Sequence, residues 1–355
     1  MKTMKRITES KNIISRVFPV LIGMLLVGCG ESTSPVTHSI VANMAEKTRL
    51  CSFNPAVGDQ VADNKKSCQA ESETQSMTID ELNAAARNGD TNATYELGLR
   101  YASGNGVEPD FSKAIELVEK AADAGHATAM LDLGNCFLAG KGVKKNLQKA
   151  VKYFTRSADA EHTPAMINLG LCFASGLGVK KDLRKAFDLY SKAADLSDPN
   201  GMCAVGLCYQ DGQGVDQDHG KAMEYYKKSA DAGIAKAMHN IGVMYKDGMG
   251  RDKDDSEAAI WFRLAADAGH ADAMHNLGVR YENGIGVVKN QRLAVNWYRK
   301  AIDGGCIWSI HNLGVCYLKG RGVEEDWYTA IAYFRRGAEA GCGESISALH
   351  KLGLR

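Results

Sequence analysis

Three histidine–asparagine pairs are the clearest side chains in this sequence that could do chemistry. His239–Asn240, His275–Asn276 and His311–Asn312 follow one another at intervals of 36 residues, each directly before an Ile-Gly or Leu-Gly pair. Imidazole and amide groups both donate and accept hydrogen bonds, so such a column can hold the backbone of an extended peptide. It can equally be a polar stripe that faces water. We expect no metal site, because rungs one repeat apart are too widely spaced to share an ion.

Cysteines are the second reactive group, and the chain has ten. Four of them share one column of the repeat: Cys136, Cys172, Cys208 and Cys316. Equivalent points of stacked helices lie roughly 8–10 Å apart, which is too far for a disulfide, so these four are expected to be small, semi-buried core residues. Two options for disulfides stay open, namely Cys51 with Cys68, and a pair among Cys306, Cys316 and Cys342. Because no Cys-x-x-Cys spacing occurs, no zinc site is expected.

The spacing of these residues reflects an exact internal repeat. A glycine that follows Leu, Ile or Val recurs every 36 residues, at Gly98, Gly134, Gly170, Gly206, Gly242, Gly278 and Gly314. An alanine column keeps the same step, at Ala114, Ala150, Ala186, Ala222, Ala258, Ala294 and Ala330. A period of 20–50 residues is typical of solenoids and related arrays.

Each repeat contains two helices. In residues 127–139 the apolar positions fall on one stripe of an α-helix, and Gly140 and Gly142 then end that helix. Asn146 lies in a column that holds only Asp or Asn, which predicts the N-cap of a second helix. Gly134 and Ala150 are expected to let the two helices approach closely.

Half repeats flank the full ones. Thr78 to Arg87 aligns with a second helix, and Thr78 with Glu81 forms a capping box; residues 344–354 align with a first helix. The predicted fold is therefore an all-α, right-handed α-solenoid of helix–turn–helix repeats over residues 77–355, with seven full repeats and about 16 helices.

The N-terminal residues differ in kind from the rest. A basic start precedes an apolar run from Val17 to Val27, which is too short to span a bilayer but suits a secretory signal. The sequence Leu26-Val27-Gly28-Cys29 resembles a bacterial lipobox, which implies a signal peptide over 1–28 and a lipid anchor at Cys29. An uncleaved helix, or a cleaved signal without lipid, is the alternative. Residues 29–76 are polar and are predicted to form a flexible tether.

The recurring unit, for example Ala273-Met-His-Asn-Leu-Gly-Val-Arg-Tyr-Glu-Asn-Gly-Ile-Gly-Val287, resembles the Sel-one-like repeat, a relative of the tetratricopeptide repeat. The resemblance implies that first helices line a concave face and that the protein is an adaptor or scaffold. On that face the histidine column continues in earlier repeats as Tyr95, Leu131, Ile167 and Cys203. We therefore expect a partner-binding groove formed by Tyr95 and the three His–Asn pairs.

These features favour a non-enzymatic, cofactor-free adaptor that binds a protein or peptide in the bacterial cell envelope. Because Gly30 follows Cys29, the lipoprotein resemblance implies an outer-membrane anchor facing the periplasm. A net charge of +1 gives no support for nucleic-acid binding. A secreted or surface host-interaction factor is the main alternative. A cysteine-rich branch of the family has been linked to β-lactamase activity, but its cysteine columns hold Ala and Met here, and the repeats contain no Ser-x-x-Lys.

Overall fold

The computed structural model describes residues 74–354. The predicted signal peptide, Cys29, Cys51, Cys68 and nearly all of the predicted tether lie outside these residues. The described secondary structure is entirely helical, and sixteen helices, α4 to α19, follow one another from Ile79 to Lys351. Thr74–Ser76, inside the range predicted as tether, are already helical. None of the helices in this part of the chain is long and apolar enough to cross a membrane.

Seven helix pairs form the body of the solenoid, as the 36-residue period predicts. The first helices of the pairs are α5 (Thr91–Ser103), α7 (Ala127–Ala139), α9 (Thr163–Ser175), α11 (Pro199–Asp211), α13 (Ala235–Asp247), α15 (Ala271–Asn283) and α17 (Ile307–Leu318). The second helices are α6 (Phe111–Asp123), α8 (Leu147–Asp159), α10 (Leu183–Asp195), α12 (His219–Asp231), α14 (Asp255–Asp267), α16 (Gln291–Asp303) and α18 (Trp327–Glu339). Two single helices, α4 (Ile79–Arg87) and α19 (Gly343–Lys351), flank them.

Capping residues fix where the helices begin and end. The side chain at the predicted Asp/Asn column accepts a backbone N–H in the first turn of every second helix, as Asn146 does from Lys149. Gly140 ends α7 with a φ of +75°, in the left-handed region that glycine adopts without strain. The capping box of Thr78 and Glu81 is also present at α4. The predicted boundaries are thus confirmed, because they depend on local backbone chemistry.

A close contact between a glycine and a large side chain joins the two helices of each pair. A Cβ added at Gly134 would lie 2.3 Å from the ring of Phe154, so only glycine leaves room for that ring. The same relation holds one repeat later between Gly170 and Tyr190. Phe154 is fully buried, and burying such a ring contributes about 1.5–3 kcal/mol. Gly134 therefore contacts an aromatic ring, which is a more specific arrangement than the close approach to Ala150 predicted from the sequence.

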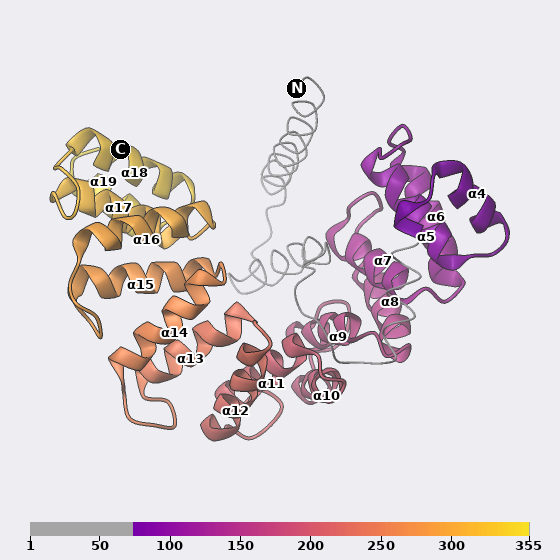
Figure 1. Cartoon of the computed structure of the whole chain (residues 1–355), viewed down its shortest axis with the longest axis horizontal. Helices are drawn as coiled ribbons and strands as arrows, with labels where there is room; N and C mark the ends of the chain where they lie inside the picture. Colours follow the sequence, from indigo (N-terminus) through magenta and orange to yellow (C-terminus); the bar gives the residue numbers. More distant parts are fainter. Residues whose placement is uncertain (1–73, 355) are drawn as a thin grey trace. The chain divides into compact units, whose positions relative to one another are not determined.

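Stacking of successive pairs completes the core. Each second helix also contacts the first helix of the next repeat, and α9 contacts α11 directly. Figure 1 shows the pairs in sequence order, with α9 and α11 on the inner side of the row and α10 and α12 on the outer side. We call the surface formed by the first helices the inner face.

No disulfide forms among the described cysteines. The column of Cys136, Cys172, Cys208 and Cys316 is buried or half-buried, as predicted. Burial raises the pKa of the Cys316 thiol to about 12, which keeps it protonated and unreactive. Cys306 and Cys342 are buried and unpaired as well, so the structure does not form the disulfide that the sequence left open among Cys306, Cys316 and Cys342.

Replacing Gly134 with alanine is expected to destabilise the solenoid by roughly 1–3 kcal/mol, the usual effect of overpacking a well-filled core. The new methyl group would overlap the buried ring of Phe154. Chemical denaturation followed by circular dichroism measures the change. Gly343→Ala is the matched control, because a Cβ at Gly343 meets no atom. Equal stability of the two variants would contradict the proposed role of the glycine–ring contact.

Candidate binding surface

The predicted groove residues all lie on the inner face, but they do not form a uniform surface. Tyr95 is half-buried, stacks on His126 and donates a hydrogen bond from its hydroxyl to Asp132 Oδ2 at 2.6 Å. In the next three repeats the column is filled by Leu131, Ile167 and Cys203, which are buried. The first half of the column therefore belongs largely to the core.

The three histidines are half-buried and bond to the neighbouring repeat. Asn276 Nδ2 donates to His239 Nε2 at 3.0 Å. His275 Nδ1 pairs with Ser309 Oγ at 2.9 Å, and His311 Nδ1 with Ser345 Oγ at 3.5 Å. The ladder that the sequence indicated as a ligand surface thus already links one repeat to the next. The second ring nitrogens, His275 Nε2 and His311 Nε2, make no hydrogen bond to the described residues. These two nitrogens are therefore open to a ligand.

Aromatic rings of the second helices pack against His275 and His311. His275 lies beside Tyr298 with ring centroids 5.9 Å apart, and His311 beside Phe334 at 5.4 Å. Tyr298 and Phe334 are the rings that lie against Gly278 and Gly314. The histidines are therefore positioned by the same contact that joins each helix pair.

Burial keeps the histidines neutral near pH 7. It lowers the pKa of His239 to about 4, and the neighbouring His270, which stacks on it at 4.6 Å, adds to this effect. Burial also lowers the pKa of His275 and of His311. Neutral rings offer hydrogen bonds without charge, which suits the recognition of peptide backbone more than that of an anion.

The asparagines have unequal environments. Asn276 is engaged with His239, whereas Asn240 Nδ2 is enclosed without a hydrogen-bond acceptor among the described residues. Asn312 is half-buried. In residues 74–354 no three His, Cys, Asp or Glu side chains come together in a group that could hold a metal ion.

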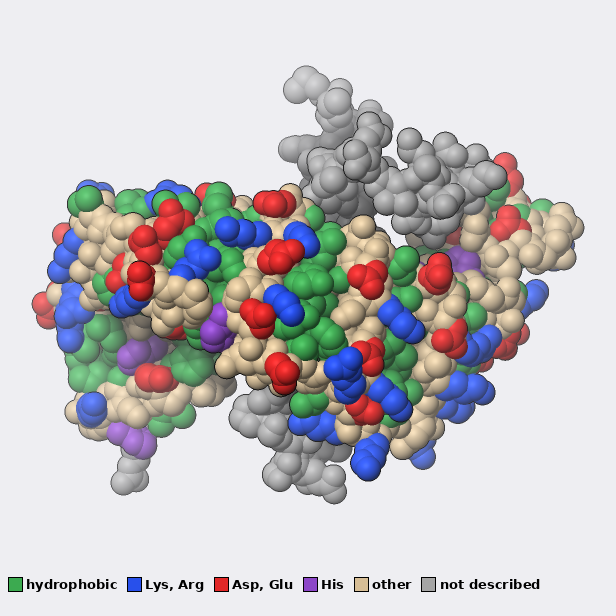
Figure 2. All heavy atoms as spheres, turned by 90° about the horizontal axis from the view of Figure 1, so that it is seen from below, with side chains coloured by type: hydrophobic (Ala, Val, Ile, Leu, Met, Phe, Trp, Pro, Cys, Tyr) green, Lys and Arg blue, Asp and Glu red, His purple; other side chains and the backbone are tan. Residues whose placement is uncertain are grey.

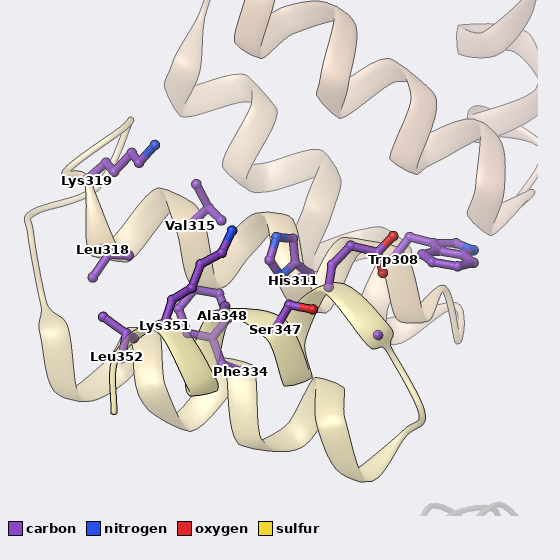
Figure 3. Close-up of a pocket in the computed structure, with 12 residues that line it drawn as sticks. Trp308, His311, Val315, Leu318, Lys319, Phe334, Ser347, Ala348, Lys351 and Leu352 are labelled. Atoms are coloured by element: carbon purple, nitrogen blue, oxygen red, sulfur yellow. The ribbon is translucent and has the colours of Figure 1, made fainter. Parts of the chain in front are cut away.

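An open groove lies where the histidine column ends, between α17 and α19. It has a volume of about 800 Å³ and is lined by Trp308, His311, Val315, Leu318, Lys319, Phe334, Gly343, Glu344, Ser347, Ala348, Lys351 and Leu352. Figure 3 shows Trp308 at one end and Lys319 at the other, with His311 and Lys351 between them. The groove therefore combines an apolar floor, a neutral imidazole, two ammonium groups and the carboxylate of Glu344.

Small residues of α19 leave this groove open. Ser347 and Ala348 occupy the positions that hold His311 and Asn312 in α17. Their short side chains cannot cover Val315 and Leu318, which stay half-buried. Trp308 adds an exposed ring, with half of its surface accessible.

Sequence reasoning missed the serine partners of the ladder and the groove itself. Ser309 and Ser345 stand in a column that is Ala or Gly in the preceding repeats, and each follows a ladder histidine by 34 residues. This change from Ala or Gly to Ser is visible in the sequence and could have predicted the bonds to the histidines. The groove was harder to find, because it depends on two small residues and on the direction of the Trp308 ring.

Comparison with known proteins identifies the repeat. Sel1 repeats match residues 91–126, 127–162, 163–198, 199–234, 235–270, 271–306 and 309–342. The chain belongs to the Sel1 repeat family. Proteins with Sel1 repeats are generally non-enzymatic scaffolds that bind other proteins. A comparison with curated proteins gave no match.

Two solved structures show the same solenoid. A Sel1 repeat protein from Oxalobacter formigenes is 29% identical, with a TM-score of 0.63 over 77% of this chain and 79% of that one. The protein c5321, described as a protective antigen of uropathogenic Escherichia coli strains, is 28% identical, with a TM-score of 0.64 over 76% of this chain. This chain covers only 58% of that antigen.

The Sel1 array is expected to lose stability as the pH falls from about 6.5 to about 4, the interval between the ordinary pKa of histidine and that of His239. The unfolded chain takes up a proton first, so stability that is fully present above this interval is lost within it. His239→Gln stays neutral and is expected to reduce the loss between pH 7 and pH 5 by about 1–2 kcal/mol.

Urea unfolding at both pH values measures this difference. His350→Gln, at an exposed histidine of α19, is the control and should keep the pH dependence of the parent chain. If His239→Gln keeps it as well, then His239 does not carry the effect.

Proposed function

We propose that this Sel1 repeat protein is a scaffold of the bacterial cell envelope that holds a polypeptide segment on its inner face. The observation that carries the proposal is the open groove between α17 and α19, which directly continues the histidine ladder. Repeat solenoids bind partners through such extended surfaces, and the family generally binds proteins.

The lining of the groove defines the chemistry of the segment. Val315 and Leu318 would accept an apolar side chain, while Trp308 offers the kind of large, accessible ring that often dominates binding energy. Lys319 and Lys351 have no ion-pair partner among the described residues and would favour an acidic group beside that side chain. His311 Nε2 is available for a backbone hydrogen bond.

The cellular location is part of the same proposal. The basic start, the short apolar run and Cys29 support a lipid anchor, which we propose to lie in the outer membrane and to face the periplasm. A scaffold held there would present its inner face to periplasmic proteins. These N-terminal residues lie outside the described part of the chain.

A second candidate is a host-contact factor that is secreted or exposed on the cell surface. The similarity to c5321, described as a protective antigen, favours this alternative. Protease treatment of intact cells separates the two locations: a periplasmic scaffold stays protected until the outer membrane is permeabilised, whereas a surface protein is cleaved at once.

Photo-crosslinking in native envelopes tests the binding surface. A crosslinking amino acid at Trp308 is expected to capture a defined partner. The same crosslinking amino acid at Trp327 of α18, which lies outside the groove and is exposed to a similar extent, should capture no partner.

Binding of the purified partner gives a second measurement. Trp308→Ala should weaken this binding by tenfold or more, about 1.4 kcal/mol, and Trp327→Ala should leave it unchanged. Equal capture at both sites, or binding insensitive to Trp308→Ala, would exclude the groove.

A further inference from the structure

One edge of the solenoid carries a concentrated positive charge that the inner face does not explain. The turns and first helical residues of two neighbouring repeats, 140–149 and 176–185, contain eight Lys or Arg residues and a single acid, Asp182. The basic residues are Lys141, Lys144, Lys145, Lys149, Lys180, Lys181, Arg184 and Lys185. We call this surface the basic edge.

Other repeats do not share this charge. Acids outnumber bases in the equivalent segments 104–113, 212–221, 248–257 and 320–329, and segment 284–293 has only Lys289 and Arg292. Since the chain as a whole has a net charge of +1, the basic edge is a local asymmetry. It is not a consequence of a basic composition.

The two basic segments are in contact with each other. Gly178, in the turn of the second segment, lies so close to Leu147 that a Cβ there would be 2.4 Å from the Leu147 carbonyl oxygen. Leu147 follows Lys144 and Lys145 by two or three residues, and Gly178 precedes Lys180 and Lys181 by the same number. The two lysine pairs therefore belong to one continuous surface. Figure 2 shows Lys and Arg side chains gathered at the horizontal position that α8 and α10 occupy in Figure 1.

These lysines stand where a positive charge is unfavourable for the fold. Both pairs lie immediately before the N-caps of α8 and α10, and neither helix has an acid in its first turn. The N-terminus of a helix carries a partial positive charge, so cations there reduce stability. Lys144, Lys145, Lys180 and Lys181 are exposed and have no ion-pair partner in the described part of the chain. These four lysines therefore form no ion pair that would stabilise the described fold.

We propose that the basic edge binds an anionic phospholipid surface. Seven of its eight basic residues are lysines, compact point charges on flexible stems that adapt to mobile headgroups, whereas the arginine fork that reads fixed phosphate geometry occurs once. The two segments contain no aromatic residue, and aromatic residues are the usual stacking platforms for single-stranded nucleic acid. Clusters of exposed lysines at a membrane surface attract anionic lipid headgroups in this way.

The basic edge would act together with the proposed lipid anchor at Cys29. A polybasic patch is a common second membrane-binding signal beside a lipid anchor. The charge of the basic edge does not depend on the anchor. Its test therefore uses the full chain with Cys29→Ser, so that a missing anchor and a non-functional edge give different results.

Vesicle flotation tests the proposal. The Cys29→Ser chain is expected to bind vesicles of phosphatidylcholine with about one third phosphatidylglycerol at low salt, and to leave them at high salt. Binding is expected to fall roughly fivefold for each lysine removed. The combined variant Lys144→Gln, Lys145→Gln, Lys180→Gln, Lys181→Gln should therefore bind roughly 600-fold more weakly.

A matched variant controls for total charge. Lys120→Gln, Lys192→Gln, Lys227→Gln and Lys300→Gln remove the same charge from exposed positions near the C-terminal ends of second helices. This variant should keep its vesicle binding. Its thermal stability should fall slightly, because cations favour that helix end, whereas the basic-edge variant should be as stable as the parent chain or more stable.

Three results would overturn the proposal. They are equal loss of binding in both variants, equal binding to pure phosphatidylcholine vesicles, and tighter edge-dependent binding to a single-stranded oligonucleotide or to poly-glutamate than to the anionic vesicles. Partner capture through Trp308 should be unaffected by the basic-edge variant, which separates this surface from the groove.

Discussion

The contact between a glycine of each first helix and a large side chain of its second helix is the constraint on which the rest of the structure depends. The ring of Phe154 occupies the space that a side chain at position 134 would fill. Because the ring is fully buried there, the distance between the two helices is set by its thickness. Six of the seven pairs repeat this arrangement with Phe or Tyr, and the first pair uses Val118 against Gly98. A fixed pair geometry lets identical pairs stack without insertions.

The inner face follows from this constraint. The rings that contact the glycines also pack against His239, His275 and His311, with similar centroid distances of 5.5, 5.9 and 5.4 Å. Their bonds to Asn276, Ser309 and Ser345 then tie each repeat to the next. The ladder therefore links neighbouring repeats, and the groove opens where Ser347 and Ala348 replace the His–Asn pair.

Buried charge shows how the stack tolerates departures from its pattern. Arg280 stands in the column that holds Cys136 and Cys172, and it is almost fully buried. Its guanidinium donates to the Asp255 backbone and carboxylate and lies over the ring of Phe262. A charge at such a site requires partners that satisfy its donors, and the neighbouring repeat supplies them. The basic edge is different, since Lys144, Lys145, Lys180 and Lys181 are exposed and form no ion pair in the described part of the chain.

The sequence by itself determined the repeat length, the pairing of helices, their capped ends and the order of the stack. These features depend on local backbone preferences and on periodic apolar residues, which any one repeat displays and seven repeats confirm. Only the tertiary structure decided which atoms of the ladder are free. His275 and Ser309 lie 34 residues apart, and their bond depends on how two repeats stack. The same is true of the groove, because the exposure of Trp308 and Val315 depends on the size of side chains in the next helix. The repeat period predicts which residues face inward. Packing between neighbouring repeats decides which of those side chains stay accessible to a partner.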